Sequence, residues 1–264
     1  MSHTLTNIIH APEGMHTRPA LLIAHGLFGS ARNFNTMGRR LASDRKVILV
    51  DMRNHGDSPW DDEVTYPAMA QDLAKTIETH ADGRAIVMGH SMGGKATMAL
   101  ALTQPDLLAG LVIADIAPVP YDHTHLGILQ AMAAADLSGV TRRSEGDALM
   151  AAALPDPALR GFILQNLVVE NGAARWRLNV PALAAGMDDL MDWPSQLSGT
   201  SYSGPTLSIY GGASPYVNQT AQAALSQFFP TAEFHEVPGA GHWLHAERPT
   251  EFQAALSTWL DTVS

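Results

Sequence analysis

Apolar residues follow two alternating patterns along most of the chain. Short continuous aliphatic runs suit strands buried on both faces of a parallel sheet, whereas apolar residues that recur every three to four positions suit helices. The predicted strands cover residues 20–24, 46–50, 84–88, 110–114 and 206–210, with a weaker one at 232–237 and an antiparallel edge strand near 4–10. The predicted helices cover residues 34–42, 67–80, 92–103, 217–229 and 249–263. This alternation predicts an α/β fold with a mostly parallel, doubly wound sheet.

One long interval, between residues 114 and 206, has no clear strand pattern. It is rich in Ala, Leu and Met, is interrupted by prolines, and predicts roughly four short helices. An irregular segment of this length inside a compact domain indicates an inserted unit. We therefore expect a helical cap at residues 117–203, placed over the carboxyl ends of the strands, and a core formed by residues 1–116 and 204–264.

The composition narrows the classes of function. Of the 264 residues, 46% are hydrophobic and 16% charged, so the chain can bury a large core. A net charge of −10 argues against nucleic acid or an anionic membrane as the partner. The lack of cysteine excludes disulfides, thiol catalysis and thiolate metal sites. The first residues do not resemble a secretory signal and no apolar run is long enough to span a membrane, so we expect a soluble, cytoplasmic protein.

The strongest motif is Gly89-His90-Ser91-Met92-Gly93, which follows a predicted strand and precedes a predicted helix. It matches G-x-S-x-G, the strand-to-helix turn that holds a nucleophilic serine in a strained backbone conformation. Only small residues fit two positions before and two after the serine. The turn presents the Ser91 hydroxyl at a helix N-terminus, where developing negative charge is favoured. Ser91 is therefore the predicted nucleophile.

The predicted base is His242, in a Gly-rich loop after the last strand, from which an imidazole can reach Ser91. His235 lies inside the last predicted strand, and His245 is expected to be a supporting or surface residue. His25 is expected to be a buried structural donor. His123 and His125 would point to opposite faces of an extended segment, so no metal site is predicted.

The acid position departs from the usual pattern, because the segment 211–217 after the fifth main strand contains no carboxylate. Asp115 stands immediately after the preceding strand, beside the elbow strand. A buried carboxylate there needs a partner, and the imidazole of His242 supplies one. Asp115 is therefore the predicted acid, with a turn-capping role as the alternative. The cap aspartates are weaker candidates: Asp188, Asp189 and Asp192.

The remaining site predictions concern the oxyanion and the substrate. Acyl transfer needs N–H donors aimed at the developing oxyanion, and we expect those of Met92 and Leu27, with Phe28 as the alternative to Leu27. Phe28, Tyr121 and Trp243, with Met92, are expected to line one apolar acyl pocket under the cap. The polar segment 51–58 is interpreted as a hydrogen-bonded turn without a chemical role.

Taken with residues 25–30, 51–58, 115–118 and 176–179, these motifs resemble the α/β-hydrolase family, and within it the small bacterial acyl esterases of the YbfF-like branch and their mitochondrial relatives. The resemblance spans nearly the whole chain. It implies a carboxylesterase or acyl-thioesterase that acts on short- to medium-chain acyl groups, and it also assigns the acid to Asp115.

The sequence thus predicts a serine hydrolase that forms an acyl-enzyme on Ser91, with no cofactor and a small acyl ester or thioester as partner. The alternative is a cofactor-free haloperoxidase or perhydrolase with the same triad. A dehalogenase is excluded, because it needs a carboxylate nucleophile. A non-catalytic receptor on the same fold is disfavoured by the complete triad. We expect a monomer or homodimer.

Overall fold

A seven-stranded sheet forms the centre of the protein, whose computed structural model describes residues 1–14 and 17–263. The strands lie in the order β1-β3-β2-β4-β5-β8-β9. Their bounds are β1 Asn7–His10, β2 Ala20–Ala24, β3 Val47–Val50, β4 Ala85–His90, β5 Leu108–Ala114, β8 Thr206–Gly211 and β9 Ala232–Val237. Only β1 runs antiparallel, against β3 at one edge, as predicted. The other pairs are parallel, so their carboxyl ends meet at one edge of the sheet.

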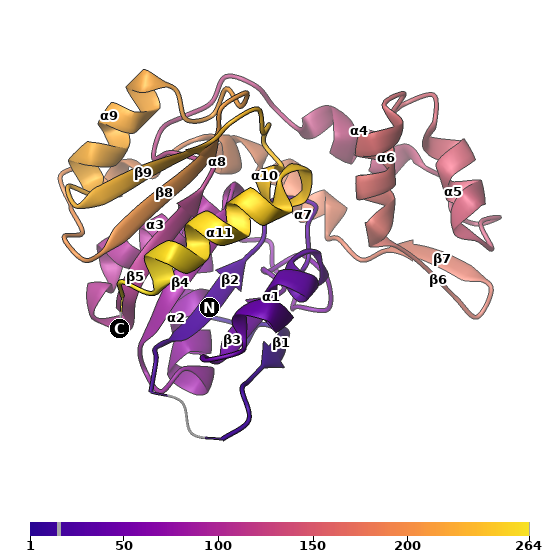
Figure 1. The fold of residues 1–264 in the computed structure, drawn as a ribbon. Coiled ribbons are helices and arrows are strands. Elements are labelled where there is room, and N and C mark those ends of the chain that lie inside the picture. Colours follow the sequence, from indigo (N-terminus) through magenta and orange to yellow (C-terminus); the bar gives the residue numbers. More distant parts are fainter. Residues whose placement is uncertain (15–16, 264) are drawn as a thin grey trace.

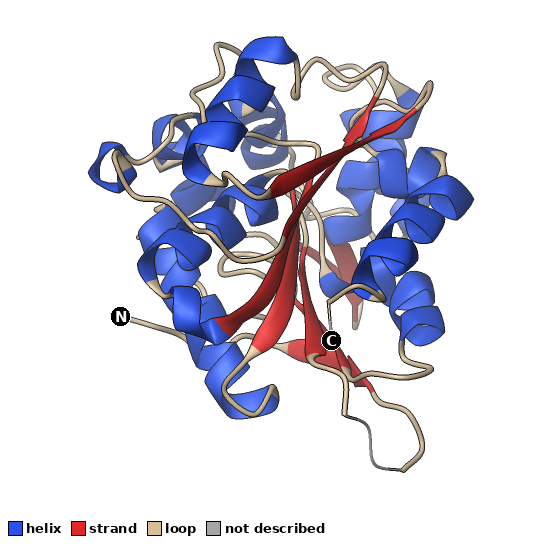
Figure 2. Ribbon diagram, turned by 60° about the vertical axis from the view of Figure 1, so that its left-hand side comes forward, coloured by secondary structure: helices blue, strands red, loops and turns tan. Residues whose placement is uncertain are grey.

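Helices cover both faces of this sheet (Figure 2). One face is packed by α2 Tyr66–His80, α3 Met92–Thr103 and α9 Gln219–Phe228, and the other by α1 Asn35–Leu41, α10 Leu244–Glu247 and α11 Pro249–Leu260. The helix starts follow from local chemistry. Thr65 caps α2 by accepting the Ala68 N–H, and Asn218 caps α9 by accepting the Ala221 N–H. The cap at Asn218 explains why α9 begins later than the predicted residue 217.

Two apolar clusters, one on each face of the sheet, hold these layers together. Every residue of β2, β3, β4 and β5 is buried, in agreement with the continuous hydrophobic runs of the sequence. Helix α3, which follows β4, is also buried on nearly all sides. The elbow between β4 and α3 is therefore held by rigid elements on both sides.

Residues 117–203 are more varied than the predicted set of about four helices. They form five α-helices, α4 Leu126–Ala134, α5 Arg143–Met150, α6 Pro157–Ile163, α7 Val180–Ala185 and α8 Met187–Met191. They also form a hairpin of β6 Leu167–Glu170 and β7 Ala173–Trp176, which the prediction missed. Its turn is Asn171-Gly172, with φ of 52° and 77° at the two residues. Asn-Gly between two β-rich runs is a strong hairpin signal, so the sequence did contain the information.

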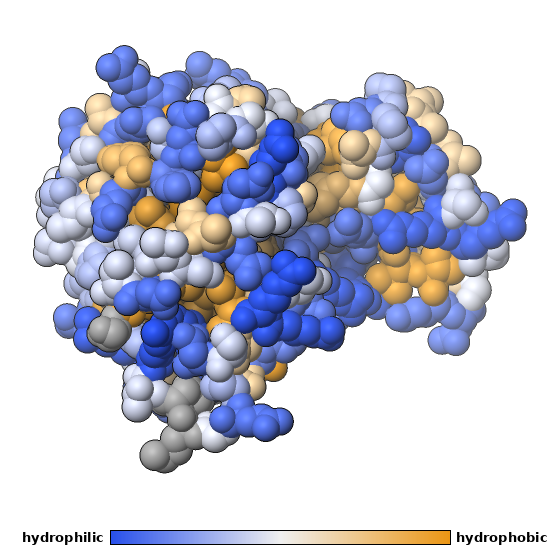
Figure 3. Space-filling view, in the orientation of Figure 1, coloured by the Kyte–Doolittle hydropathy of each residue, from blue (hydrophilic) through white to orange (hydrophobic). Residues whose placement is uncertain are grey.

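The first part of this segment, α4 to β7, projects beyond the sheet as a separate lobe (Figure 1). Hydrophobic side chains gather on this lobe, while hydrophilic residues cover most of the visible core surface (Figure 3). The second part, α7 and α8, is fastened to the core. The Asn179 amide donates to Asn54 Oδ1 at 3.0 Å, and the Tyr66 hydroxyl donates to the Leu190 carbonyl at 2.6 Å. Among the described residues, no helix is long and apolar enough to cross a membrane.

Candidate active site

Ser91 stands in the sharp turn between β4 and α3. Its φ and ψ are 53° and −120°, a region that residues other than glycine rarely occupy. The neighbouring glycines make the turn possible. A Cβ on Gly89 would lie 2.3 Å from the Gly93 carbonyl oxygen, and one on Gly93 would lie 2.5 Å from the Ala24 carbonyl oxygen. The sequence expectation that only small residues fit at these positions is confirmed.

The structure brings Ser91, His242 and Asp115 into one hydrogen-bonded chain. His242 Nε2 lies 3.0 Å from Ser91 Oγ, and His242 Nδ1 lies 2.7 Å from Asp115 Oδ2. An ionised carboxylate only accepts hydrogen bonds, so Nδ1 carries the proton and Nε2 keeps its lone pair toward the serine hydroxyl. The arrangement can remove the proton of Ser91 and leave the positive charge of the imidazolium beside a carboxylate.

Asp115 itself is completely buried and follows β5 with a φ of 52°. Its Oδ1 accepts the Gly211 N–H at 2.9 Å, and its Oδ2 accepts the Ser214 hydroxyl at 2.5 Å in addition to His242. Three donors therefore satisfy the buried carboxylate. The sequence analysis noted only that segment 211–217 lacks a carboxylate and missed that Ser214, within it, binds the acid. The sequence signal for this contact was the position of Ser214 just after β8, the strand that pairs with β5, which Asp115 follows.

The N–H groups of Leu27 and Met92 are free for an oxyanion, because neither donates a hydrogen bond within residues 1–14 and 17–263. Met92 is the first residue of α3, where the helix dipole adds to the attraction for negative charge. The Phe28 N–H, the alternative to Leu27, instead donates to His55 Nε2 at 3.3 Å. The geometry therefore favours Leu27 over Phe28.

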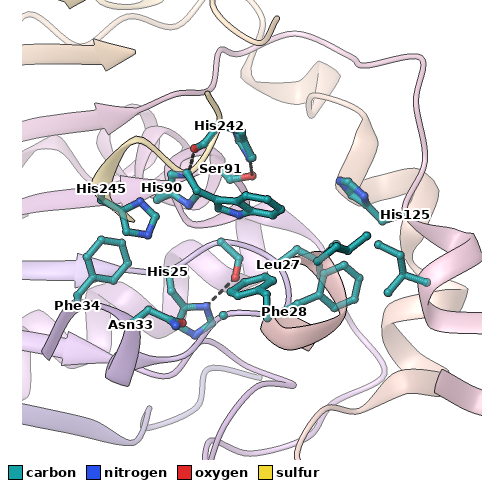
Figure 4. Close-up of a pocket in the computed structure, with 16 residues that line it drawn as sticks. His25, Leu27, Phe28, Asn33, Phe34, His90, Ser91, His125, His242 and His245 are labelled. Carbon is teal, nitrogen blue, oxygen red and sulfur yellow. Dashed lines mark hydrogen bonds between the residues drawn. The ribbon is translucent and has the colours of Figure 1, made fainter. Parts of the chain in front are cut away.

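Two cavities meet at Ser91 and share Leu27 and His125 as further lining residues. The first is lined by His242 and by an apolar wall that includes Phe28, Trp243, Ile128, Leu159 and Phe162. Figure 4 shows Ser91 and His242 on one side of this cavity, with His125 across from them.

The second cavity is lined by Leu27, Ser91 and Met92 and extends toward Tyr121 and Lys95. The expected substrate-binding residues are thus divided, with Phe28 and Trp243 in the first cavity and Tyr121 in the second. The hydroxyl of Tyr121 also has a structural role, because it accepts the Ala117 N–H and donates to the Tyr216 carbonyl, both at 3.0 Å.

Buried histidines surround the candidate base. His90 Nε2 lies 2.8 Å from the His242 carbonyl oxygen and donates to it, which fixes the loop that carries the base. His25 is 1% exposed, donates through Nδ1 to the Gly26 carbonyl and accepts the Met52 N–H at Nε2, as expected for a structural residue. Burial lowers the pKa of His25 to about 4 and that of His55 to about 3, so both are neutral near pH 7.

Other sequence expectations are corrected by the structure. The rings of His123 and His125 do not point to opposite faces but pack edge to face, with centroids 5.2 Å apart. Of the two roles expected for His245, supporting and surface, the structure agrees with the first, because its ring stacks on Phe34 at 4.6 Å and burial lowers its pKa to about 4. His235 lies exposed in β9, as expected. In the described part of the chain, no group of three His, Asp or Glu side chains could hold a metal ion.

The polar segment 51–58 forms the hydrogen-bonded turn that was predicted. Asp51 accepts the N–H groups of Ala31 and Asp57, and the Ser58 hydroxyl donates to the Asp51 carbonyl. Asp188, Asp189 and Asp192 form no hydrogen bond with His242 in the described residues, whereas Asp115 does. Asp192, for example, accepts the N–H of Trp193 through its carboxylate at 2.7 Å. These contacts leave Asp115 as the carboxylate that faces His242.

Comparisons with known proteins agree with this fold. A family model described as alpha/beta hydrolase fold matches residues 19–249. Esterase YbfF of Escherichia coli is 38% identical, with 94% of this chain and 96% of that protein covered. The sn-1-specific diacylglycerol lipase ABHD11 of Mus musculus is also 38% identical, over 94% of this chain and 83% of that protein. A solved structure of a marine microorganism esterase has a TM-score of 0.90 at 31% identity and covers 98% of this chain and 100% of its own.

Proposed function

The chain belongs to the alpha/beta hydrolase fold family, and we propose that it is a carboxylic ester hydrolase with Ser91, Asp115 and His242 as its catalytic triad. The observation that carries the proposal is the pair of contacts at His242, 3.0 Å to Ser91 Oγ and 2.7 Å to Asp115 Oδ2. Both lie within hydrogen-bonding reach, as nucleophilic catalysis by a serine requires. The similarity to esterases and lipases favours ester hydrolysis over the haloperoxidase alternative.

The first half-reaction forms an acyl-enzyme. His242 Nε2 takes the proton of Ser91 as Oγ attacks the ester carbonyl, and the N–H groups of Leu27 and Met92 hold the oxygen that becomes negative. Asp115 keeps the imidazole in the reactive tautomer and stabilises the imidazolium. As the tetrahedral intermediate collapses, the C–O bond to the alcohol breaks and the imidazolium gives its proton to the leaving oxygen.

The second half-reaction repeats these steps with water. His242 removes a proton from a water molecule, which attacks the acyl carbonyl, and the same imidazolium then returns a proton to Ser91 Oγ. The carboxylic acid is released and the enzyme is restored. Asp115 is held throughout by Ser214, which donates to the same Oδ2 atom as His242, and by the Gly211 N–H, which donates to Oδ1.

The two cavities support short- to medium-chain acyl esters or thioesters as substrates. The cap contributes Ile128, Leu159 and Phe162 to the first cavity, so residues 117–203 act as a cap that shapes the substrate site in this proposal. Among the relatives, one is named for a diacylglycerol substrate and another only as an esterase. Substrates with an apolar chain attached to the ester group fit both the cavity walls and these names.

Steady-state hydrolysis of a panel of p-nitrophenyl esters, from acetate to decanoate, tests the proposal. We expect turnover by the wild type and its loss, by about 10⁴-fold or more in kcat, in Ser91→Ala. Ser138→Ala, at an exposed serine of the cap, is the matched control and should retain full activity. Ester hydrolysis by Ser91→Ala at the wild-type rate would contradict the assignment of the nucleophile.

A further inference from the structure

Lys95 is a buried cation that the mechanism above does not use. It lies on α3 one turn after Ser91 and is 1% exposed. Its Nζ donates to the carbonyl oxygens of Met191 and Asp192, at 3.1 and 2.7 Å. Within residues 1–14 and 17–263 no carboxylate lies at ion-pair distance from it, and the charge of Asp192 opposes the lowering of its pKa only from farther away. The carboxylate of Asp192 accepts the Trp193 N–H instead.

The surroundings of Lys95 leave its charge only partly compensated. An ammonium group has three donors, and the two carbonyl oxygens use two of them. The rings of Tyr66 and Tyr121 lie 5.5 and 4.9 Å from Nζ and add only the weak attraction of aromatic faces. Burial lowers the pKa of Lys95 to about 7, which expresses how poorly the site solvates the cation. An anion placed at Nζ would therefore be strongly favoured.

Lys95 forms part of the wall of the second cavity, together with Ser91. Ser91 is the N-cap of α3, and the Lys95 N–H donates to the Ser91 carbonyl at 3.0 Å, so Lys95 lies one turn away from the candidate nucleophile. Side chains on a helix lean toward its N-terminus, which for α3 is the end that carries Ser91. The wall also includes Ile116 and Leu190, the rings of three tyrosines, and those of His123 and His125, whose pKa values burial lowers so that both are neutral near pH 7. A group that extends from a carbonyl at Ser91 into this cavity thus meets a single cation.

The division between the cavities decides which part of the substrate reaches Lys95. His242 must give its proton to the leaving oxygen, and His242 lines the first cavity but not the second. Leu27 and Ser91 line both cavities, but Met92, whose N–H faces the acyl carbonyl in the proposed mechanism, lines only the second. The leaving alcohol therefore belongs to the first cavity and the acyl group to the second.

We propose that Lys95 determines acyl-group specificity by binding a carboxylate at the far end of the acyl chain, so that monoesters of short dicarboxylic acids are the preferred substrates. This inference rests on the proposed esterase function. The spacing between Ser91 and Lys95 suits an acyl chain with about two to four methylene groups between the carbonyl and the carboxylate. The free N–H of Lys95 donates to the carboxylate, and no bond of the substrate changes there.

The test compares monomethyl succinate, glutarate and adipate with the corresponding monoamides, in which an uncharged group of the same shape replaces the carboxylate. Methanol release is measured at pH 6.5, where Lys95 is charged. We expect the wild type to prefer the acid over the amide by about 10- to 100-fold in kcat/KM for at least one chain length, mainly through KM. Lys95→Met should abolish this preference and Lys95→Arg should retain part of it. Lys75→Met, at a lysine of α2 that lines neither cavity, should keep the wild-type preference.

Inhibition of the wild type by free glutarate and butyrate provides a second measurement that needs no variant. We expect glutarate to inhibit hydrolysis of a neutral ester at least 10-fold more tightly than butyrate. The proposal is overturned if the wild type hydrolyses acid and amide equally well, or if Lys95→Met lowers both rates by the same factor, because Lys95 would then only fasten α8 to the core. The proposed esterase function fails separately, if no ester, charged or neutral, is hydrolysed.

Discussion

Replacing Asp115 with asparagine removes the charge of the candidate acid and turns one acceptor oxygen into an NH₂ donor. Its carboxylate now accepts three hydrogen bonds, from His242, Ser214 and the Gly211 N–H. An amide has one oxygen and one NH₂ group, so Asp115→Asn cannot satisfy all three donors. If the NH₂ group faces His242, Nδ1 must accept, and the Nε2 proton then points at Ser91. If it faces Gly211, two donors meet in a buried place, at a cost of about 1–3 kcal/mol.

The first orientation should therefore prevail, and it removes the base. We expect kcat for a neutral p-nitrophenyl ester to fall by about 10⁴-fold, which corresponds to roughly 5.4 kcal/mol of transition-state stabilisation. The free energy of unfolding should change by much less, because the amide oxygen still accepts the Gly211 N–H. This contrast distinguishes a catalytic acid from a carboxylate that only caps the turn after β5.

The assay combines steady-state kinetics with urea unfolding for the wild type, Asp115→Asn and Asp192→Asn. Asp192 lies in the cap, where its carboxylate binds Trp193, and serves as the matched control. The reasoning is refuted if Asp115→Asn keeps more than a tenth of wild-type kcat, or if Asp192→Asn abolishes turnover while Asp115→Asn does not.

Three further predictions follow from the same contacts. Ser214→Ala removes one of the hydrogen-bond donors to Asp115, and we expect kcat to fall about 10-fold while its pH dependence is retained. An unchanged kcat would assign Ser214 a purely structural role. His25 and His55 have lower pKa values in the folded than in the unfolded protein, so their contribution to stability is present above pH 6.5 and is lost as pH falls. The free energy of unfolding measured in urea should decrease by about 2 kcal/mol per histidine between pH 6.5 and 5. A urea midpoint that stays constant over this range would contradict the prediction. Lys95 loses its charge above its pKa of about 7, so KM for a dicarboxylic monoester should rise at higher pH while KM for the monoamide stays constant. If KM changes with pH in the same way for both substrates, the charge of Lys95 has no role in binding.

Much of the fold was predictable because buried parallel strands appear in the sequence as continuous hydrophobic runs. The strand limits at 20–24 and 232–237 and the helix at 92–103 agree with β2, β9 and α3. The catalytic candidates benefited from the same regularity. Ser91 and Asp115 directly follow adjacent parallel strands, and His242 follows the last strand, so their proximity could be inferred from strand order and loop length alone.

The features that sequence reasoning missed depend on contacts between segments distant in the chain. The stacking of His245 on Phe34 and the short bond from Ser214 to Asp115 require the register of the sheet and the path of its loops. The two-cavity site depends on how residues 117–203 dock, which periodicity does not determine. The hairpin at Asn171-Gly172 is different, since its turn signal was present and only the surrounding helical pattern obscured it.

Covalent labelling of Ser91 tests the central claim most directly. The wild type and Ser91→Ala are treated with a fluorophosphonate, their intact masses are measured, and the labelled peptide is identified. The account predicts one probe molecule per wild-type chain, attached to Ser91, with loss of esterase activity in proportion to labelling and no label on Ser91→Ala. Active enzyme that stays unlabelled, or a probe attached to another residue as activity disappears, would contradict it.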